Sequence, residues 1–189
     1  MEIYTLSVTV LWLILLTFWA VTAVTAKKTI RNGGWRQWFL FRIFFIILVT
    51  LAFHSQIIHW SPGYRVFAST NQMLGLIGVL VTAIGVAFSI WARMHLGRNW
   101  GMPMSEKKEP ELVTSGPYAS VRHPIYAGIL IAALGSALVV GPIWLLTIFI
   151  IAVYFIYSAI KEETHLMAIF PTQYPEYKKR TKMLIPFVF

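Results

Sequence analysis

Long apolar segments dominate this chain and restrict the folds open to it. A helix needs roughly 20 mostly apolar residues to cross the hydrocarbon core of a bilayer. Hydrophobic residues make up 58% of the 189 residues and charged residues only 12%, about half the share in a soluble domain. We therefore expect an all-α integral membrane protein, and we exclude a disordered chain, a nucleic-acid-binding domain and an ordinary soluble enzyme. Five transmembrane helices are predicted, at about residues 3–26, 38–58, 73–92, 124–140 and 143–160.

The basic residues predict the orientation of these spans. The net charge is +9, and 15 of the 16 Lys and Arg residues fall within 27–42, 93–122 and 161–182, with Arg65 the exception. Loops on the cytoplasmic side of a membrane carry an excess of Lys and Arg. Five spans bring the three basic segments to one face, so we expect the N-terminus outside and the C-terminus inside. Membrane lipids, and not nucleic acid, are the partners expected from this charge.

We expect a single membrane domain over residues 1–189. Residues 1–92 would form three scaffold spans with few reactive side chains. Residues 93–189 would supply a cytoplasmic connector, a hairpin of the last two spans around Gly141-Pro142, and a C-terminal cytoplasmic helix as a cap. The chain has no Cys and no Asp. Thiol chemistry is therefore excluded, and any acid chemistry depends on seven Glu residues.

A proline marks the predicted start of the fourth span. Proline is favoured at the first helical position, and it disfavours a helical conformation at His123. The free backbone N–H groups after Pro124, together with the helix dipole, would suit an anion such as a carboxylate. Arg122 and His123 stand beside this position in the sequence. The alternative interpretation is a plain helix start with interfacial Arg, His and Tyr anchors.

Two adjacent carboxylates, Glu162 and Glu163, follow the fifth span and oppose its helix dipole. They are tolerated if the helix continues to about Ala168, or if a cation lies against them. One of them could hold the ammonium group of a ligand, and the alternative is a solvated acidic edge. Two Glu with His165 do not make a metal pattern without further acids or a His-x-x-x-His spacing, so we expect no metal.

The remaining polar residues of this half are interpreted as lipid contacts. Arg93 and His95 are typical of headgroup contacts near a membrane surface. Tyr174 and Tyr177, with the basic run at 178–180, favour contact with an anionic lipid surface.

An ordered set of motifs resembles the isoprenylcysteine carboxyl methyltransferase family, over about residues 93–187. The motifs are Leu112-Val113-Thr114-Ser115-Gly116-Pro117-Tyr118, Arg122-His123-Pro124-x-Tyr126-x-Gly128, Glu162-Glu163-x-x-Leu166, Tyr174-x-x-Tyr177 and Pro186. The chain is most similar to the short, five-span prokaryotic members. The resemblance implies an integral membrane methyltransferase that uses S-adenosylmethionine without a dinucleotide-binding fold.

The resemblance also implies the site residues. Leu112 and Val113 would line the adenosine pocket, and the cofactor would further contact Tyr118, His123, Pro124, Ile125, Tyr126 and Glu162. No catalytic residue is assigned, and the candidates are Arg122, Glu163 and His165. The implied acceptor is lipidic, an isoprenylcysteine-like carboxylate that enters from the bilayer. The active site would lie on the cytoplasmic side.

Two departures leave the acceptor open. Pro110 stands where eukaryotic members carry His, and Ser158 stands where they carry an Arg that holds the acceptor carboxylate. An amino headgroup of a phospholipid is an alternative acceptor, and it would need a base such as Glu163 or His165. Two further classes of protein stay open, an NADPH-dependent sterol-type reductase and a non-enzymatic membrane scaffold.

Overall fold

The structure, a computed structural model, describes residues 2–23, 29–31, 71–99, 106–107, 111–141 and 143–186. Two short 3-10 turns, η1 (Gly97–Asn99) and η2 (Gly116–Ala119), flank the connector. A small antiparallel ribbon, which the sequence does not predict, pairs β1 (Thr29–Arg31) with β2 (Glu106–Lys107). The helices are α1 (Glu2–Ala23), α5 (Gln72–Leu96), α6 (Pro124–Val140), α7 (Ile143–Ile169) and α8 (Gln173–Arg180).

Three of the described helices are long and apolar enough to cross a membrane: Ile3–Ala23, Gln72–Asn99 and Trp144–Ile169. Helix α6 is a shorter apolar helix of 17 residues. These four helices confirm the first, third, fourth and fifth predicted segments as helical. The second predicted span, residues 38–58, lies outside the described residues. The number of five spans and their orientation therefore stay predictions.

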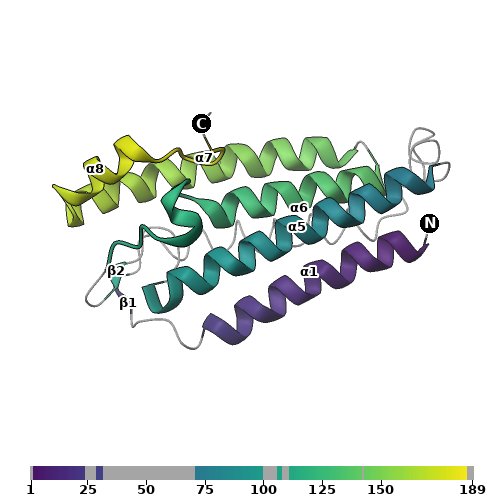
Figure 1. Cartoon of the computed structure of the whole chain (residues 1–189), viewed down its shortest axis with the longest axis horizontal. Coiled ribbons are helices and arrows are strands. Elements are labelled where there is room, and N and C mark those ends of the chain that lie inside the picture. Colours follow the sequence, from purple (N-terminus) through teal and green to yellow (C-terminus); the bar gives the residue numbers. More distant parts are fainter. Residues whose placement is uncertain are drawn as a thin grey trace.

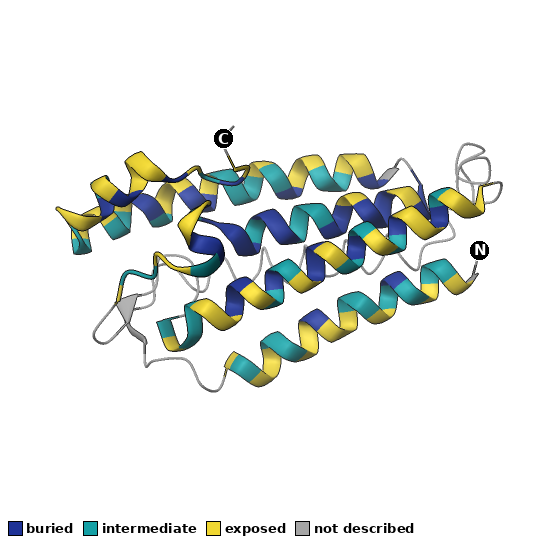
Figure 2. Cartoon of the chain, viewed as in Figure 1, coloured by how far each residue is buried: buried dark blue, intermediate teal, exposed yellow. Residues whose placement is uncertain are grey.

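The four apolar helices lie side by side, in the order α1, α5, α6 and α7 (Figure 1). Buried residues lie mainly where the helices adjoin one another, and all four helices also carry exposed residues (Figure 2). Many of these exposed residues are large and apolar, such as Leu13 (55% exposed), Leu80 (53%) and Phe149 (66%). Water would disfavour so much apolar surface, whereas lipid chains accept it.

Helices α5 and α6 form the most extensive interface of the described part. Small residues allow it, because a side chain at Gly85 would clash with the backbone of α6, and one at Gly128 with the hydroxyl of Ser89. The Ser89 hydroxyl also donates a hydrogen bond to the carbonyl of Ile125 at 3.3 Å. Close approach of this kind is how helices gain contact where no hydrophobic effect drives them together.

A buried arginine joins the ends of α1 and α5. The guanidinium of Arg93, a residue only 2% exposed, donates to the carbonyls of Thr22 at 2.7 Å and Gly97 at 2.8 Å. Both carbonyls belong to helix C-terminal ends, where the dipoles place partial negative charge. The interpretation of Arg93 as a headgroup contact is therefore wrong, and the residue is an internal link between two helices.

Candidate functional site

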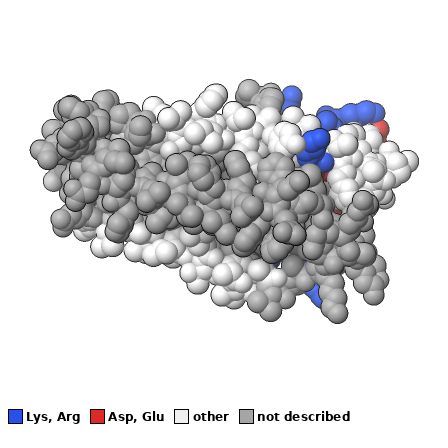
Figure 3. Space-filling view, turned by 180° about the vertical axis from the view of Figure 1, so that it is seen from behind, with Lys and Arg blue, Asp and Glu red and all other residues white. Residues whose placement is uncertain are grey.

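The predicted site residues gather at one end of the bundle, where α5 ends, α6 begins and α7 meets α8 (Figure 1). On the face seen in Figure 3, the described Lys and Arg side chains also gather at this end. Helix α6 starts at Pro124 as predicted, with His123 as its N-cap at φ −124° and ψ 61°. Helix α7 continues to Ile169 and so extends past the two adjacent carboxylates.

Glu163 lies at the centre of a buried ion-pair network. Its carboxylate, 2% exposed, contacts Arg122 Nε at 2.6 Å and Lys178 Nζ at 2.7 Å. Nε2 of His123 lies 3.5 Å from the same carboxylate. Arg122 is itself only 8% exposed, and it also donates to the backbone carbonyl of Thr181. The predicted cation against the adjacent carboxylates is thus present, and it comes from α8 and from the residues before α6.

Glu162 has a different environment from its neighbour. Its side chain is 35% exposed, and Oε2 accepts a hydrogen bond from the Tyr126 hydroxyl at 3.3 Å. The Tyr126 ring stacks between two other rings, with centroids 5.4 Å from His123 and 4.5 Å from Phe155. Glu162 therefore keeps an accessible negative charge beside an aromatic column, which together suit a ligand cation.

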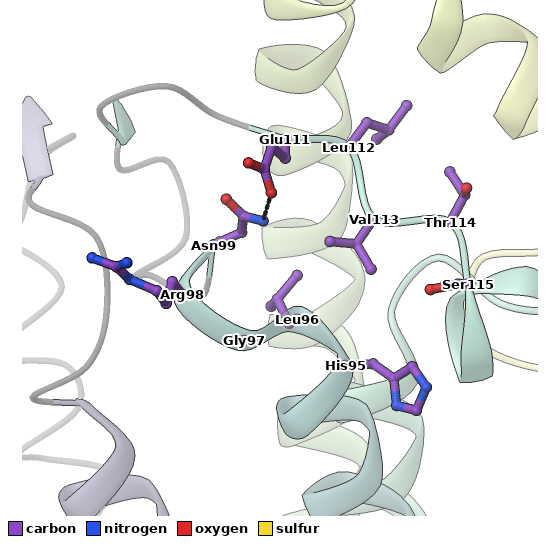
Figure 4. A pocket seen from close by; sticks show the side chains of 10 residues that line it. All are labelled: His95, Leu96, Gly97, Arg98, Asn99, Glu111, Leu112, Val113, Thr114 and Ser115. Carbon is purple, nitrogen blue, oxygen red and sulfur yellow. Dashed lines mark hydrogen bonds between the residues drawn. The ribbon is translucent and has the colours of Figure 1, made fainter.

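A pocket of about 590 Å³ opens between the end of α5 and residues 111–115 (Figure 4). Its volume falls within the roughly 300–1,000 Å³ range of small-molecule sites. Leu96, Leu112 and Val113 supply apolar side chains to the lining, whereas Asn99 and Glu111 supply polar ones. Leu112 and Val113 are the two residues that the resemblance assigns to an adenosine pocket.

Tyr118 packs near the pocket residues and also feels the charge of Glu162. Val113 and Leu96 pack against a cluster that contains Tyr118 and Ile125. Burial, together with the nearby charge of Glu162, raises the pKa of the Tyr118 phenol far above its usual range. This phenol therefore stays protonated at neutral pH and can donate a hydrogen bond but cannot act as a base.

The C-terminal segment covers the start of α6. The backbone N–H of Arg122 donates to the carbonyl of Lys182 at 2.8 Å, and that of His123 to Met183 at 3.0 Å. The Tyr177 hydroxyl donates to the carbonyl of Tyr118 at 2.7 Å. The tail therefore covers the residues before Pro124, which is itself fully buried, and an anion site on the backbone N–H groups after Pro124 stays a prediction.

The sequence interpretation of two tyrosines also changes at this end. Tyr174 is 1% exposed and Tyr177 4%, so these rings are buried under the tail and do not contact a lipid surface. His165 Nε2 is buried without a hydrogen-bond partner. Among the residues that the structure describes, no group of three His or Glu side chains could hold a metal ion.

The sequence does not predict that Lys178 pairs with Glu163 or that Arg93 binds the carbonyls of two helix ends. The sequence places Lys178 in a basic run at 178–180, whereas in the structure it pairs with Glu163, 15 positions away in the chain. For Arg93 the sequence signal is a charge at the end of a predicted span, which needs compensation if it is buried. Lys178 lies in a run of three basic residues and carries no such signal.

Apolar helices long enough to span a membrane, with a pocket at one end of the bundle, are the features of a multi-pass membrane protein. The model of the phospholipid methyltransferase family matches residues 73–173 of the chain. The chain therefore belongs to the phospholipid methyltransferase family, whose members are S-adenosylmethionine-dependent methyltransferases. The matched region begins in α5 and ends at the start of α8, so it contains the pocket, Arg122 and both adjacent carboxylates but not Lys178 and the tail.

Curated relatives fall into two groups. The nickel-cobalt-cadmium resistance protein NccN of Alcaligenes xylosoxydans is 28% identical over 82% of this chain and 64% of its own length. The cobalt-zinc-cadmium resistance protein CzcN of Cupriavidus metallidurans is 30% identical over 82% and 63%. The protein-S-isoprenylcysteine O-methyltransferase of Schizosaccharomyces pombe is 31% identical over 51% and 43%. The chain thus spans less than two thirds of the length of these relatives.

Proposed function

We propose that this chain transfers the methyl group of S-adenosylmethionine to a lipid-borne acceptor, as a short prokaryotic member of the isoprenylcysteine carboxyl methyltransferase type. The observation that carries the proposal is the contrast between two neighbouring carboxylates. Glu163 is neutralised by Arg122 and Lys178, whereas Glu162 is accessible beside an aromatic column. One carboxylate thus organises the site, and the other is available for a ligand cation.

The residues present fit the donor chemistry. Bound S-adenosylmethionine supplies an electrophilic methyl group, and its other parts are an adenosine, an ammonium and a carboxylate. Leu112 and Val113 offer an apolar wall for adenine, and Glu162 offers a charge for the ammonium. Tyr118, near both of these regions, would contact the bound donor with a protonated phenol. His123, Pro124, Ile125 and Tyr126 would shape the site from the start of α6.

The favoured acceptor is the carboxylate of an isoprenylcysteine-like lipid that enters from the bilayer. A carboxylate is already ionised at neutral pH, so methylation on oxygen needs no base. Glu163 and Arg122 are committed to each other at 2.6 Å, which makes both poor proton-transfer groups. Catalysis would then rest on alignment of the two reactants and on exclusion of water, for which an enclosed bundle end is suited.

A phospholipid amino headgroup is the second candidate acceptor. The family match favours this acceptor, because the matching family is described as phospholipid methyltransferase. An amine must lose a proton before or during transfer, and the described candidate for that role is His165, whose buried Nε2 is unpaired. The sterol-type reductase is less suited, because Arg122 and Lys178, which could hold a 2′-phosphate, are already paired with Glu163.

The orientation of the chain in the membrane is part of the same proposal. The basic residues that surround the site would face the cytoplasm, where the water-soluble donor is available. The N-terminus would lie outside, and the acceptor would reach the site sideways between helices.

The test is transfer of labelled methyl from S-adenosylmethionine by the purified full-length chain in proteoliposomes. A prenylcysteine and phosphatidylethanolamine are offered separately. We expect label in the prenylcysteine as a base-labile methyl ester, and loss of transfer in Glu162→Gln. Glu176→Gln, the same change at an exposed carboxylate of α8, is the matched control and should transfer normally. Label only in phosphatidylethanolamine would assign the amine acceptor, and absence of transfer to either lipid would refute the proposal.

A further inference from the structure

The C-terminal segment that follows α7 presents two different faces. Its inward face consists of residues that are at most 5% exposed: Tyr174, Tyr177, Thr181 and Leu184. Its outward face consists of exposed residues near the end of α8 and after it: Arg180, Lys182 and Ile185. The backbone is extended at Thr181, with φ −125° and ψ 157°, and successive side chains of an extended chain point to opposite sides. A basic and partly apolar face is thus directed away from the bundle.

The outward face lies close to the level at which α7 leaves its apolar part. Helix α8 starts at the far end of the bundle and runs back along α7, so the tail after it lies nearer the apolar helices (Figure 1). The contact of Lys178 with Glu163 at 2.7 Å fixes the end of α8 beside this part of α7. Two residues before Glu163, the ammonium of Lys161 lies 5.8 Å from the centre of the Tyr157 ring, which is 45% exposed. Lys and Tyr at the end of an apolar helix are typical of a membrane–water interface, so we expect the outward face to lie at this interface.

The cations of the outward face differ from the other basic residues around them. Three described basic side chains each contact a glutamate carboxylate within 2.7 Å: Arg122, Lys178 and Lys179. Arg180 and Lys182 form no ion pair within the part of the chain that the structure describes. Such charges beside a membrane attract anionic lipid headgroups. The exposed Ile185, 54% accessible, adds apolar surface that a lipid can cover and that a free anion in water cannot.

We propose that the outward face docks on the headgroups of anionic phospholipids, with Arg180 and Lys182 at the phosphates and Ile185 among the uppermost acyl carbons. The same stretch of backbone accepts hydrogen bonds from the N–H groups of Arg122 and His123. A lipid bound to the outward face would therefore also hold the tail over the residues before α6. The docking surface goes beyond the proposed methyl transfer and does not depend on it.

The test is the quenching of a fluorophore by lipids in proteoliposomes of the full-length chain. The chain has no Cys, so a single label can be placed at Ile185→Cys. The quenchers are phosphatidylglycerol and phosphatidylcholine, each with a nitroxide near the headgroup, in a background of phosphatidylcholine. One Lys or Arg near an anionic membrane surface strengthens the attraction about 5-fold, so we expect phosphatidylglycerol to be preferred about 5-fold or more. This preference should fall below about 2-fold in the double variant Arg180→Gln with Lys182→Gln, and it should persist in Arg180→Lys with Lys182→Arg, which keeps both charges.

A label at Gln173→Cys, an exposed position at the start of α8, is the control for position and should show no such preference. Equal quenching by both lipids at Ile185→Cys, absence of quenching, or an unchanged preference in the neutral double variant overturns the docking surface. An equal preference at the two labelled positions also overturns it, because the net charge of the whole chain would then be its cause. Displacement of the lipid by inorganic phosphate at constant ionic strength would assign the cations to a free anion and overturn it as well. Both double variants change only exposed side chains, so the buried face that holds the tail stays intact, and none of these outcomes affects the proposed methyl transfer.

Discussion

Removal of the Glu163 side chain should destabilise the chain strongly, because it would strand a buried cation. Arg122 is 8% exposed and Glu163 2% exposed, so bulk water screens their 2.6 Å contact little. Loss of one partner from such a pair costs about 3–5 kcal/mol. Lys178 is 43% exposed and can turn toward solvent, so its lost contact adds at most about 1 kcal/mol. We therefore expect Glu163→Ala to lower the free energy of unfolding by about 3–5 kcal/mol.

The assay is equilibrium unfolding by SDS in mixed micelles, followed by the fluorescence of the eight Trp residues. Glu176→Gln is the control, because its pair with Lys179 is 65% and 71% exposed, and it should leave the unfolding curve unchanged. The double variant Arg122→Met with Glu163→Leu should recover much of the loss, since no unpaired charge stays buried. Two results would refute the reasoning. One is a loss of less than about 1 kcal/mol in the free energy of unfolding of Glu163→Ala. The other is a double variant whose loss equals the sum of the losses in the two single variants.

Three further predictions concern the helix bundle. Arg93→Met should broaden the distance distribution between spin labels at Val21→Cys and Arg98→Cys, because it removes the link between α1 and the end of α5; an unchanged distribution would contradict that link. Gly85→Val should lower the free energy of unfolding by about 1–3 kcal/mol through overpacking against α6, and a neutral result would mean that the two helices separate freely. Tyr177→Phe removes a hydrogen bond to the η2 backbone and should cost about 1 kcal/mol in the same unfolding assay, whereas no change would show that the tail is held by other contacts.

Local patterns in the sequence were sufficient for much of the fold. The start of α6 at Pro124 and the hairpin after it follow from the conformational limits of proline and glycine, which act on neighbouring residues. The extension of α7 past Glu162 and Glu163 also follows from a local rule, because two carboxylates at a helix end would oppose the dipole.

Contacts between distant segments could not be predicted in this way. The pairing of Arg122 with Glu163 joins residues 41 positions apart, and the Arg93 contact with Thr22 joins residues 71 apart. No periodicity encodes such contacts, since they depend on how the helices pack in space. The same limit explains why the sequence places Tyr174 on a lipid surface, although the fold buries its ring under the tail.

The division of roles between the two neighbouring carboxylates illustrates the limit for the site. Glu162 and Glu163 are adjacent in sequence and are equal candidates there for a ligand charge. Successive residues on a helix point about 100° apart, so one side chain faces the network of α6 and α8 and the other is half-exposed. The resemblance alone assigns the cofactor to Glu162, and the three-dimensional arrangement adds that Glu163 is paired in a buried network.

The central claim is that this end of the bundle binds a methyl donor through Glu162. Titration of S-adenosylmethionine and NADPH against the purified full-length chain, with Glu162→Gln and Glu176→Gln alongside, tests it most directly. We expect saturable binding of S-adenosylmethionine and none of NADPH, with affinity about 10-fold or more weaker in Glu162→Gln and unchanged in Glu176→Gln. Tighter binding of NADPH, or equal binding of S-adenosylmethionine by the Glu162 variant and the wild-type chain, would contradict it.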